Sequence, residues 1–164
     1  MSLYLRFFGG GLVLLSALAA SSEYSAYAER RLAQYSGLLA LLSHAEGMIS
    51  RFLSSGDGLW RGFENEELEK IGLLPILREG KTLSKAFLEC EGRFVLSKEA
   101  KERIKDFLST SGRGYMEGEV AAFSGFRAQL DTEMKAEKER LEKNVKVTRA
   151  LLLGGALAFL ILII

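Results

Sequence analysis

Cysteine and histidine, which often bind metal ions or act as nucleophile and base, each occur once in the 164-residue chain, as Cys90 and His44. A single cysteine and a single histidine cannot form an intramolecular disulfide or a four-ligand zinc site. Cys90 closes an apolar stretch, so it is expected to be a small buried hydrophobic side chain. His44 is expected to lie on a helix with its polar side outward.

The segment Glu79-Gly80-Lys81-Thr82 resembles the end of a phosphate-binding loop. That motif needs a glycine five residues before its second glycine, and a strand before the loop. Pro75 occupies the glycine position, and no strand is predicted. We therefore interpret Lys81 as an exposed turn residue and expect no nucleotide cofactor.

Four acidic side chains lie close together in the middle of the chain: Glu64, Glu66, Glu67 and Glu69. We interpret them as the solvated face of a helix, with a docking patch for a basic partner as the alternative. No serine has a histidine or acid partner that the sequence identifies. We therefore expect no enzymatic activity, no catalytic residues, no bound metal and no small-molecule substrate.

The balance of charges argues against nucleic-acid binding. The chain has 22 Lys and Arg residues against 21 Asp and Glu, and every acid lies between Glu23 and Glu142. Electrostatic binding to DNA or RNA requires basic residues gathered on one surface without interleaved acids, and no such stripe is present. One proline and few β-branched runs favour helix, so the predicted fold class is all-α.

An uncharged apolar segment, ALLLGGALAFLILII, forms residues 150–164. As a helix these residues span about 22 Å, less than the roughly 30 Å hydrocarbon core of a bilayer. Extension back to Val145, with the stems of Lys146 and Arg149 reaching the headgroups, gives about twenty residues. Residues 145–164 are therefore predicted to form a C-terminal transmembrane helix.

A second uncharged segment, FFGGGLVLLSALAASS, forms residues 7–22 behind Arg6. We predict an N-terminal transmembrane helix over residues 1–22. The alternative is a cleaved secretory signal peptide, because one basic residue, an apolar centre and small residues around Ala19 fit that pattern.

Six basic residues lie between Lys135 and Arg149, directly before the C-terminal segment. Positive charge that flanks a span stays in the cytoplasm. Residues 23–144 are therefore predicted to form a helical domain that faces the cytoplasm.

Small residues recur at helical spacing in both predicted spans. Such faces let two helices approach closely in lipid, although glycine and alanine are common in membrane helices in any case. The candidate packing residues are Gly9, Ser16 and Ala20 at one end and Ala150, Gly154 and Ala158 at the other.

Between the spans, apolar residues recur with the helical period. The pattern predicts a long first helix from Glu23 to about Ser54, short helices over 59–71 and 82–91 separated by a turn over 72–80, and a helix over 98–111. Ser97 is the predicted N-cap of the last of these.

The final helix is predicted to begin near Tyr115 and to continue into the membrane. Its apolar seam comprises Phe123, Phe126, Leu130, Met134, Glu137, Leu141 and Val145. Its outer faces carry the i,i+4 pairs Asp131–Lys135, Glu139–Lys143 and Glu142–Lys146, each worth about 0.2–0.5 kcal/mol. Residues 115–144 are interpreted as a charged stalk helix.

Four segments carry a family resemblance in chain order: LLALLSHAEGMISRF, ILREGKTLSKAF, FLSTSGRG and LLLGGALAFLILII. With the glycine-bearing N-terminal segment, they make essentially the whole chain resemble the stage III sporulation protein AB family. Residues 77–87 are also similar to type II secretion system F domains. One corner departs from the family pattern, because Gly112, Arg113 and Gly114 stand where a glycine followed by Asp and Gln is usual.

The resemblance implies a compact bundle of about six helices that acts as the membrane platform of a secretion-like channel complex between mother cell and forespore. It also implies a location in the mother-cell membrane around the forespore. The expected partners are a cytoplasmic secretion-type AAA-like ATPase and other membrane subunits of the complex.

Position along the chain, farthest from both membrane segments, suggests the candidate partner contacts Arg61, Glu64, Glu67, Lys81 and Lys85. Two alternatives to the platform function remain. One is a membrane-tethered signalling or sensor protein, and the other is a tail-anchored extracytoplasmic protein released from a cleaved signal.

Overall fold

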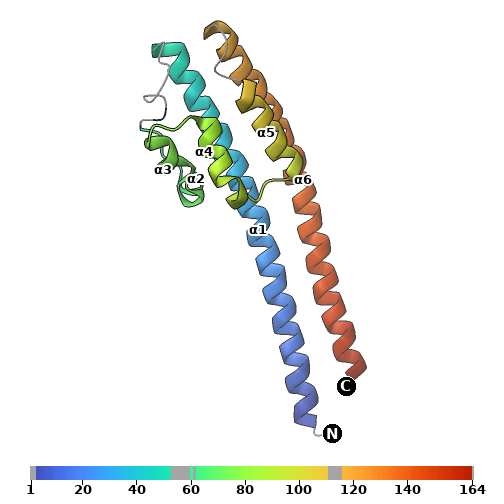
Figure 1. The fold of residues 1–164 in the computed structure, drawn as a ribbon. Coiled ribbons are helices and arrows are strands. Elements are labelled where there is room, and N and C mark those ends of the chain that lie inside the picture. Colours follow the sequence, from blue (N-terminus) through green and yellow to red (C-terminus); the bar gives the residue numbers. More distant parts are fainter. Residues whose placement is uncertain (1–2, 53–59, 61, 111–115, 164) are drawn as a thin grey trace. The chain divides into compact units, whose positions relative to one another are not determined.

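The computed structural model of the chain describes residues 3–52, 60, 62–110 and 116–163. These residues contain six α-helices and no strand (Figure 1). The helices are α1 (Leu3–Phe52), α2 (Glu66–Ile71), α3 (Leu73–Arg78), α4 (Leu83–Cys90), α5 (Lys98–Thr110) and α6 (Met116–Ile163), with a 3-10 turn, η1 (Glu91–Arg93), after α4. The predicted all-α class and the predicted number of helices are confirmed.

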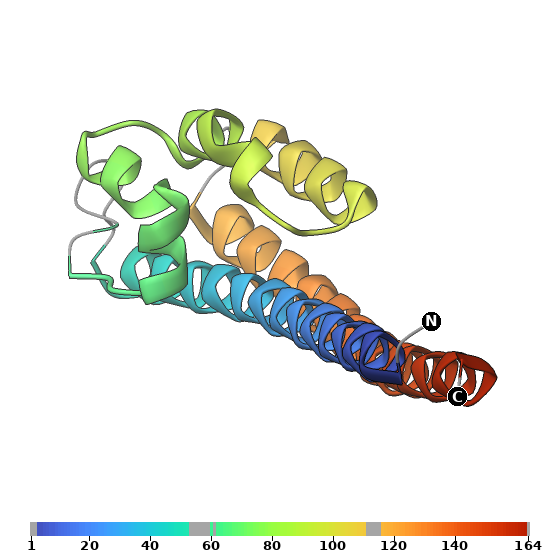
Figure 2. The same ribbon diagram turned by 90° about the horizontal axis from the view of Figure 1, so that it is seen from below.

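The chain forms two compact units. The terminal unit consists of residues 1–29 and 137–164, and the central unit consists of residues 30–136. In the terminal unit, the first part of α1 and the last part of α6 lie side by side, with both chain ends at the same end of the pair (Figures 1 and 2). The two ends of the sequence therefore meet in one unit.

The central unit contains the hydrophobic core. Figure 2 shows α2 to α5 along one side of the α1 and α6 segments. The core of this unit includes Tyr35, Leu41 and Ala45 from α1, Leu68 from α2, Leu74 from α3, Phe87 from α4, Ile104 from α5 and Leu130 from α6. Of the seam predicted for the final helix, Phe123 and Leu130 are buried in this unit, and Phe126 and Met134 are half-buried.

Three polar side chains fix where the short helices begin. The Asn65 side chain accepts a hydrogen bond from the Leu68 amide at 3.0 Å, Thr82 from Lys85 at 3.4 Å, and Ser97 from Ala100 at 3.1 Å. Each satisfies an amide in a first helical turn, where no intrahelical partner exists. The predicted Ser97 cap is confirmed.

Two predicted boundaries were wrong. The helix predicted over 59–71 begins only at Glu66, after Gly62 at φ 78° and the Asn65 cap. The turn predicted over 72–80 contains α3, because Pro75 lies in the first turn of that helix, where a missing amide breaks no helical bond. The breaks predicted at 54–58 and 112–114 lie outside the described residues.

The N-terminal segment and the long first helix, predicted as separate elements, form the single helix α1. Within the described part of the chain, no helix combines the length and the apolar character that crossing a bilayer requires. The two predicted transmembrane helices are therefore not supported there. Their uncharged runs of sixteen and fifteen residues are shorter than the about twenty residues of a typical span.

Candidate functional site

A buried glutamine connects three segments of the central unit. Gln34 on α1 is only 1% exposed. Its Oε1 accepts a hydrogen bond from the Val95 amide at 2.7 Å, and its Nε2 donates to Oε1 of Glu67 on α2 at 3.3 Å. Sequence analysis missed Gln34, although a polar residue within an otherwise apolar helix face was a usable signal.

Side chains at the start of α2 pack directly against Gly37 of α1. A Cβ atom added to Gly37 would lie 2.9 Å from Oδ1 of Asn65 and 3.0 Å from Cγ of Leu68. At the other end of α2, Gly72 adopts φ 91°, and the Arg93 guanidinium donates to the Ile71 carbonyl at 3.0 Å. These contacts hold α2 and the turn after it in place on the central unit.

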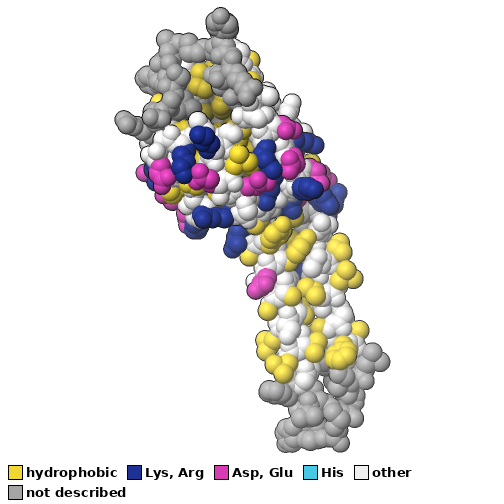
Figure 3. Space-filling model, viewed as in Figure 1, with side chains coloured by type: hydrophobic (Ala, Val, Ile, Leu, Met, Phe, Trp, Pro, Cys, Tyr) yellow, Lys and Arg dark blue, Asp and Glu magenta, His cyan; other side chains and the backbone are white. Residues whose placement is uncertain are grey.

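The outer surface of α2 to α4 carries opposite charges that pair with one another. Lys70 lies 2.8 Å from Glu66, Arg78 lies 2.8 Å from Glu69, and Lys81 lies 2.8 Å from Glu89. The hydrogen bonds that Lys70 and Lys81 donate to the carboxylates of Glu66 and Glu89, respectively, raise the pKa values of the two lysines. Figure 3 shows basic and acidic side chains interleaved over this region. The solvated acidic face predicted for α2 is thus partly neutralised by nearby cations.

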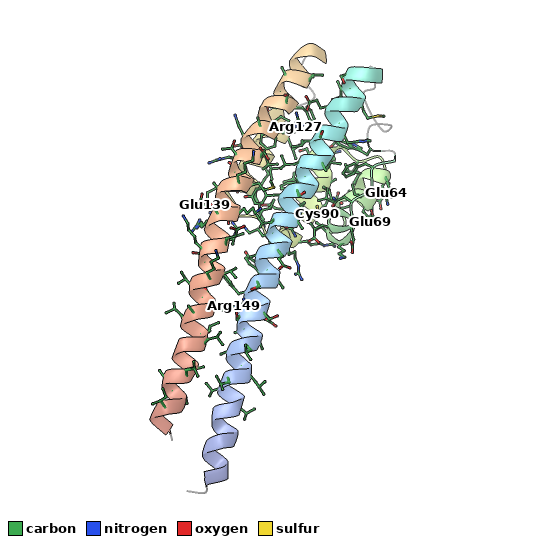
Figure 4. The ribbon with its side chains drawn as sticks, turned by 180° about the vertical axis from the view of Figure 1, so that it is seen from behind. Glu64, Glu69, Cys90, Arg127, Glu139 and Arg149 are labelled. Carbon is green, nitrogen blue, oxygen red and sulfur yellow. The ribbon has the colours of Figure 1, made fainter. Side chains whose placement is uncertain are left out.

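The structure places the predicted partner contacts in different environments. Glu64 and Lys85 are exposed and make no ion pair with any described residue. Glu67 is half-buried and accepts from Gln34, while Lys81 is engaged by Glu89. Arg61 lies outside the described residues. Figure 4 labels Glu64 and Glu69 on this side of the unit.

Cys90 and His44 both lie against apolar surroundings. The Cys90 thiol is fully buried and donates to the Ala86 carbonyl at 3.0 Å, and burial raises its pKa to about 11. The prediction of a small buried side chain is confirmed. His44 was predicted to point its polar side outward, but its ring packs on Phe63 with centroids 5.2 Å apart. Its buried Nε2 has no hydrogen-bond partner among the described residues. The described part of the chain contains no group of three potential metal ligands.

In the apolar ends of the terminal unit, the fully buried positions among the described residues are small, and several large apolar side chains are exposed. On α1, the buried positions are Gly10, Ala17, Ser21 and Ala28, with Leu14 and Tyr24 half-buried between them. Buried positions on α6 in this unit are Leu141 and Ala156. The exposed large apolar residues are Leu12, Leu15, Leu18, Tyr27, Val147, Leu151, Leu157, Phe159 and Ile161.

The spacing of the buried α1 residues alternates between four and three, as in a coiled-coil seam. The candidate packing residues chosen from the sequence lie off this seam. Gly9 is half-buried, whereas Ser16, Ala20, Ala150, Gly154 and Ala158 are exposed. The physical reason is the seven-residue repeat, which selects Ala17 and Ser21 rather than their neighbours.

The charged part of α6 matches its prediction closely. Phe123, Leu130 and Leu141 of the predicted seam are buried. The pairs Asp131–Lys135 and Glu139–Lys143 are formed at 2.6 and 2.9 Å, while Glu142 pairs with Lys138 at 4.0 Å instead of with Lys146.

Two further ion pairs connect α6 to its neighbours in the central unit. Arg127 on α6 lies 3.2 Å from Glu46 on α1, and Glu133 on α6 pairs with Arg103 on α5. Figure 4 shows Arg127 and Glu139 on α6. The central unit thus combines an apolar core with a surface on which several charges are paired.

Comparison with known proteins identifies the family of this helical chain. Searches of curated proteins and of solved structures gave no match. The profile of the stage III sporulation protein AB family matches residues 77–164, which is more than half of the chain and includes all of α4, α5 and the described α6. The chain therefore belongs to the stage III sporulation protein AB family, which implies a role in stage III of sporulation.

Proposed function

We propose that this chain is a membrane-anchored platform in a secretion-like channel complex between mother cell and forespore. Its terminal unit inserts into the mother-cell membrane around the forespore, with each apolar end acting as a membrane helix. Its central unit faces the cytoplasm and docks a secretion-type ATPase and neighbouring membrane subunits. The chain acts by holding these partners in place, and it catalyses no reaction.

The observation that carries this proposal is the distribution of side-chain size in the terminal unit. Ala17 and Ala156 are buried, whereas Leu151 is 70% exposed and Ile161 is 77% exposed. Apolar surface in water costs about 25 cal/mol per Å², so a soluble helix pair buries its leucines. In lipid, small residues at the contact allow close packing while large apolar side chains face the acyl chains. Figure 3 shows hydrophobic side chains over much of this unit.

The charges beside the apolar ends support a cytoplasmic central unit. All charged residues after Glu142 are basic. Two of them, Lys146 and Arg149, lie directly before the apolar segment. Basic residues next to a membrane segment favour the cytoplasmic side. A domain tethered in this way raises the effective concentration of any partner that it binds at the membrane.

Glu64 and Lys85 are the best candidates for the ATPase contact. Both are exposed and unpaired among the described residues, so their charges are available to a partner. Glu67 is less suitable because its carboxylate is bound to Gln34.

The test is affinity capture of the full-length tagged chain from detergent-solubilised membranes of sporulating cells, at low and high salt. We expect recovery of a secretion-type ATPase from wild type and loss of it from Glu64→Lys combined with Lys85→Glu. The matched control is Lys98→Glu with Glu99→Lys, which reverses two exposed charges on α5. Recovery of a kinase or response regulator instead would replace the platform with the signalling alternative.

A further inference from the structure

The basic residues at the end of the charged part of α6 fall into two groups. Lys135, Lys138 and Lys143 each form an ion pair with an acid one turn away, at 2.6, 4.0 and 2.9 Å. The bond to Glu139 raises the pKa of Lys143. These three cations are therefore compensated within the chain.

Arg140, Lys146 and Arg149 form the second group. All three are exposed, and none makes an ion pair with any described residue. Of the three, only Lys146 and Arg149 follow Glu142 and lie next to the apolar segment. No acidic residue follows Glu142 in the sequence. On the α1 side of the terminal unit the acids are Glu23 and Glu29, which are exposed and make no ion pair in the described part of the chain.

Bare apolar side chains lie beside these two cations. Val147 is 56% exposed, and Leu151, two residues beyond Arg149, is 70% exposed. Lys and Arg keep their stems on apolar surface while their charged groups reach outward. A ligand that matches this surface must place a negatively charged group at the two cations and hydrocarbon against the neighbouring apolar side chains.

We propose that Lys146 and Arg149 bind the phosphate groups of anionic phospholipids. The inference rests on the membrane anchoring proposed above and adds the class of lipid. Compensated cations such as Lys138 and Lys143 contribute little, because an ion pair presents almost no net charge to the headgroup.

The probe is fluorescently labelled phosphatidylglycerol, titrated into the full-length chain in neutral detergent micelles, with labelled phosphatidylcholine as the reference lipid. Wild type is expected to prefer phosphatidylglycerol. Lys146→Gln with Arg149→Gln is expected to weaken its binding about 25-fold, from about five-fold for each cation near a membrane surface. Excess inorganic phosphate should not displace the lipid, because it lacks the hydrocarbon part of the contact.

Lys138→Gln with Lys143→Gln is the matched control, because it removes the same formal charge from the same helix. The inference is overturned if both double variants lose phosphatidylglycerol binding equally. It is also overturned if wild type does not prefer phosphatidylglycerol to phosphatidylcholine. Circular dichroism checks that both variants remain helical. Carbonate extraction of membranes separates the two proposals: a chain that stays in the membrane without a lipid preference refutes only this inference, whereas release into the supernatant refutes both.

Discussion

At the scale of single residues, Gln34 is the polar group on which the short helices depend most directly. Its side chain accepts from Val95 and donates to Glu67, so it joins α1 to α2 and to the segment before α5. A buried donor or acceptor without a partner costs about 1–3 kcal/mol. We expect Gln34→Ala to lower the free energy of unfolding by about that amount, measured by chemical denaturation of the full chain in detergent. Gln129→Ala, at an exposed position, is the control and should change it by less than about 0.5 kcal/mol.

Gly37 offers a second prediction, about close packing. Its added Cβ would meet Asn65 and Leu68 at 2.9 and 3.0 Å, so Gly37→Ala should displace the start of α2 and cost about 1–3 kcal/mol of unfolding free energy. Gly47, on the same helix, has open space around it. Gly47→Ala should instead stabilise by up to about 1 kcal/mol through helix propensity. Equal effects of the two substitutions would show that helix propensity, and not the contact with α2, governs Gly37.

The Cys90 thiol predicts a dependence of stability on pH. Its pKa is raised from 9.0 to about 11 by burial, so the folded chain holds the proton more tightly than the unfolded chain does. Stability from this group is therefore fully present below pH 9 and is lost as pH rises from 9 towards 11, by about 1.4 kcal/mol per pH unit. Denaturation curves between pH 7 and 10.5 measure the loss. In Cys90→Ala, the unfolding free energy should fall less steeply with pH in this range. The same pH dependence in Cys90→Ala and wild type would contradict the assignment of the loss to the Cys90 thiol.

At the scale of elements, the contact between α1 and α6 in the terminal unit depends on small buried residues. Ala17→Leu should force the two helices apart and lower the melting temperature in detergent, with overpacking costing about 1–3 kcal/mol. Ala20→Leu, three residues along on an exposed face, should have little effect. The reverse order of effects would favour the packing faces chosen from the sequence.

The helical elements differ in how well the sequence predicts them. The long amphipathic stretches of α1, α5 and α6 were recognisable because their apolar residues keep one period over many turns. The bounds of α2 and α3 were not, because each has six residues and is fixed by the Asn65 cap, Gly72 and tertiary packing. The sequence could not identify the buried face of the two apolar ends, because glycine and alanine occur on several faces of both segments. Only the register against the other helix distinguishes the buried Ala17 from the exposed Ser16.

The candidate surface was predictable only in part for a related reason. Charged residues on short helices are visible in the sequence, but their pairing depends on side chains brought together by folding. Lys81 meets Glu89 across a helix, and Glu67 meets Gln34 from 33 residues away. Sequence analysis could therefore name Glu64 and Lys85 but had no means to separate them from their paired neighbours.

At the scale of the whole molecule, deletion of residues 150–164 tests whether the terminal unit anchors the chain. The deletion removes one of the two apolar ends and exposes the α1 face that contains Ala17. We expect wild type to resist carbonate extraction from membranes and the shortened chain to be released in part. Full retention of the shortened chain would assign the anchor to α1 alone.

The division of the terminal unit between the two ends of the sequence also determines the order of events during synthesis. Residues 1–29 leave the ribosome first, and their partner begins only at Glu137. At roughly 5–20 residues per second, the intervening 107 residues take about 5–20 s to make. Throughout that interval the seam residues Ala17 and Ser21, which are buried in the folded unit, have no helix beside them. Early capture of the nascent N-terminal segment, by a targeting factor or by the bilayer itself, is the expected consequence.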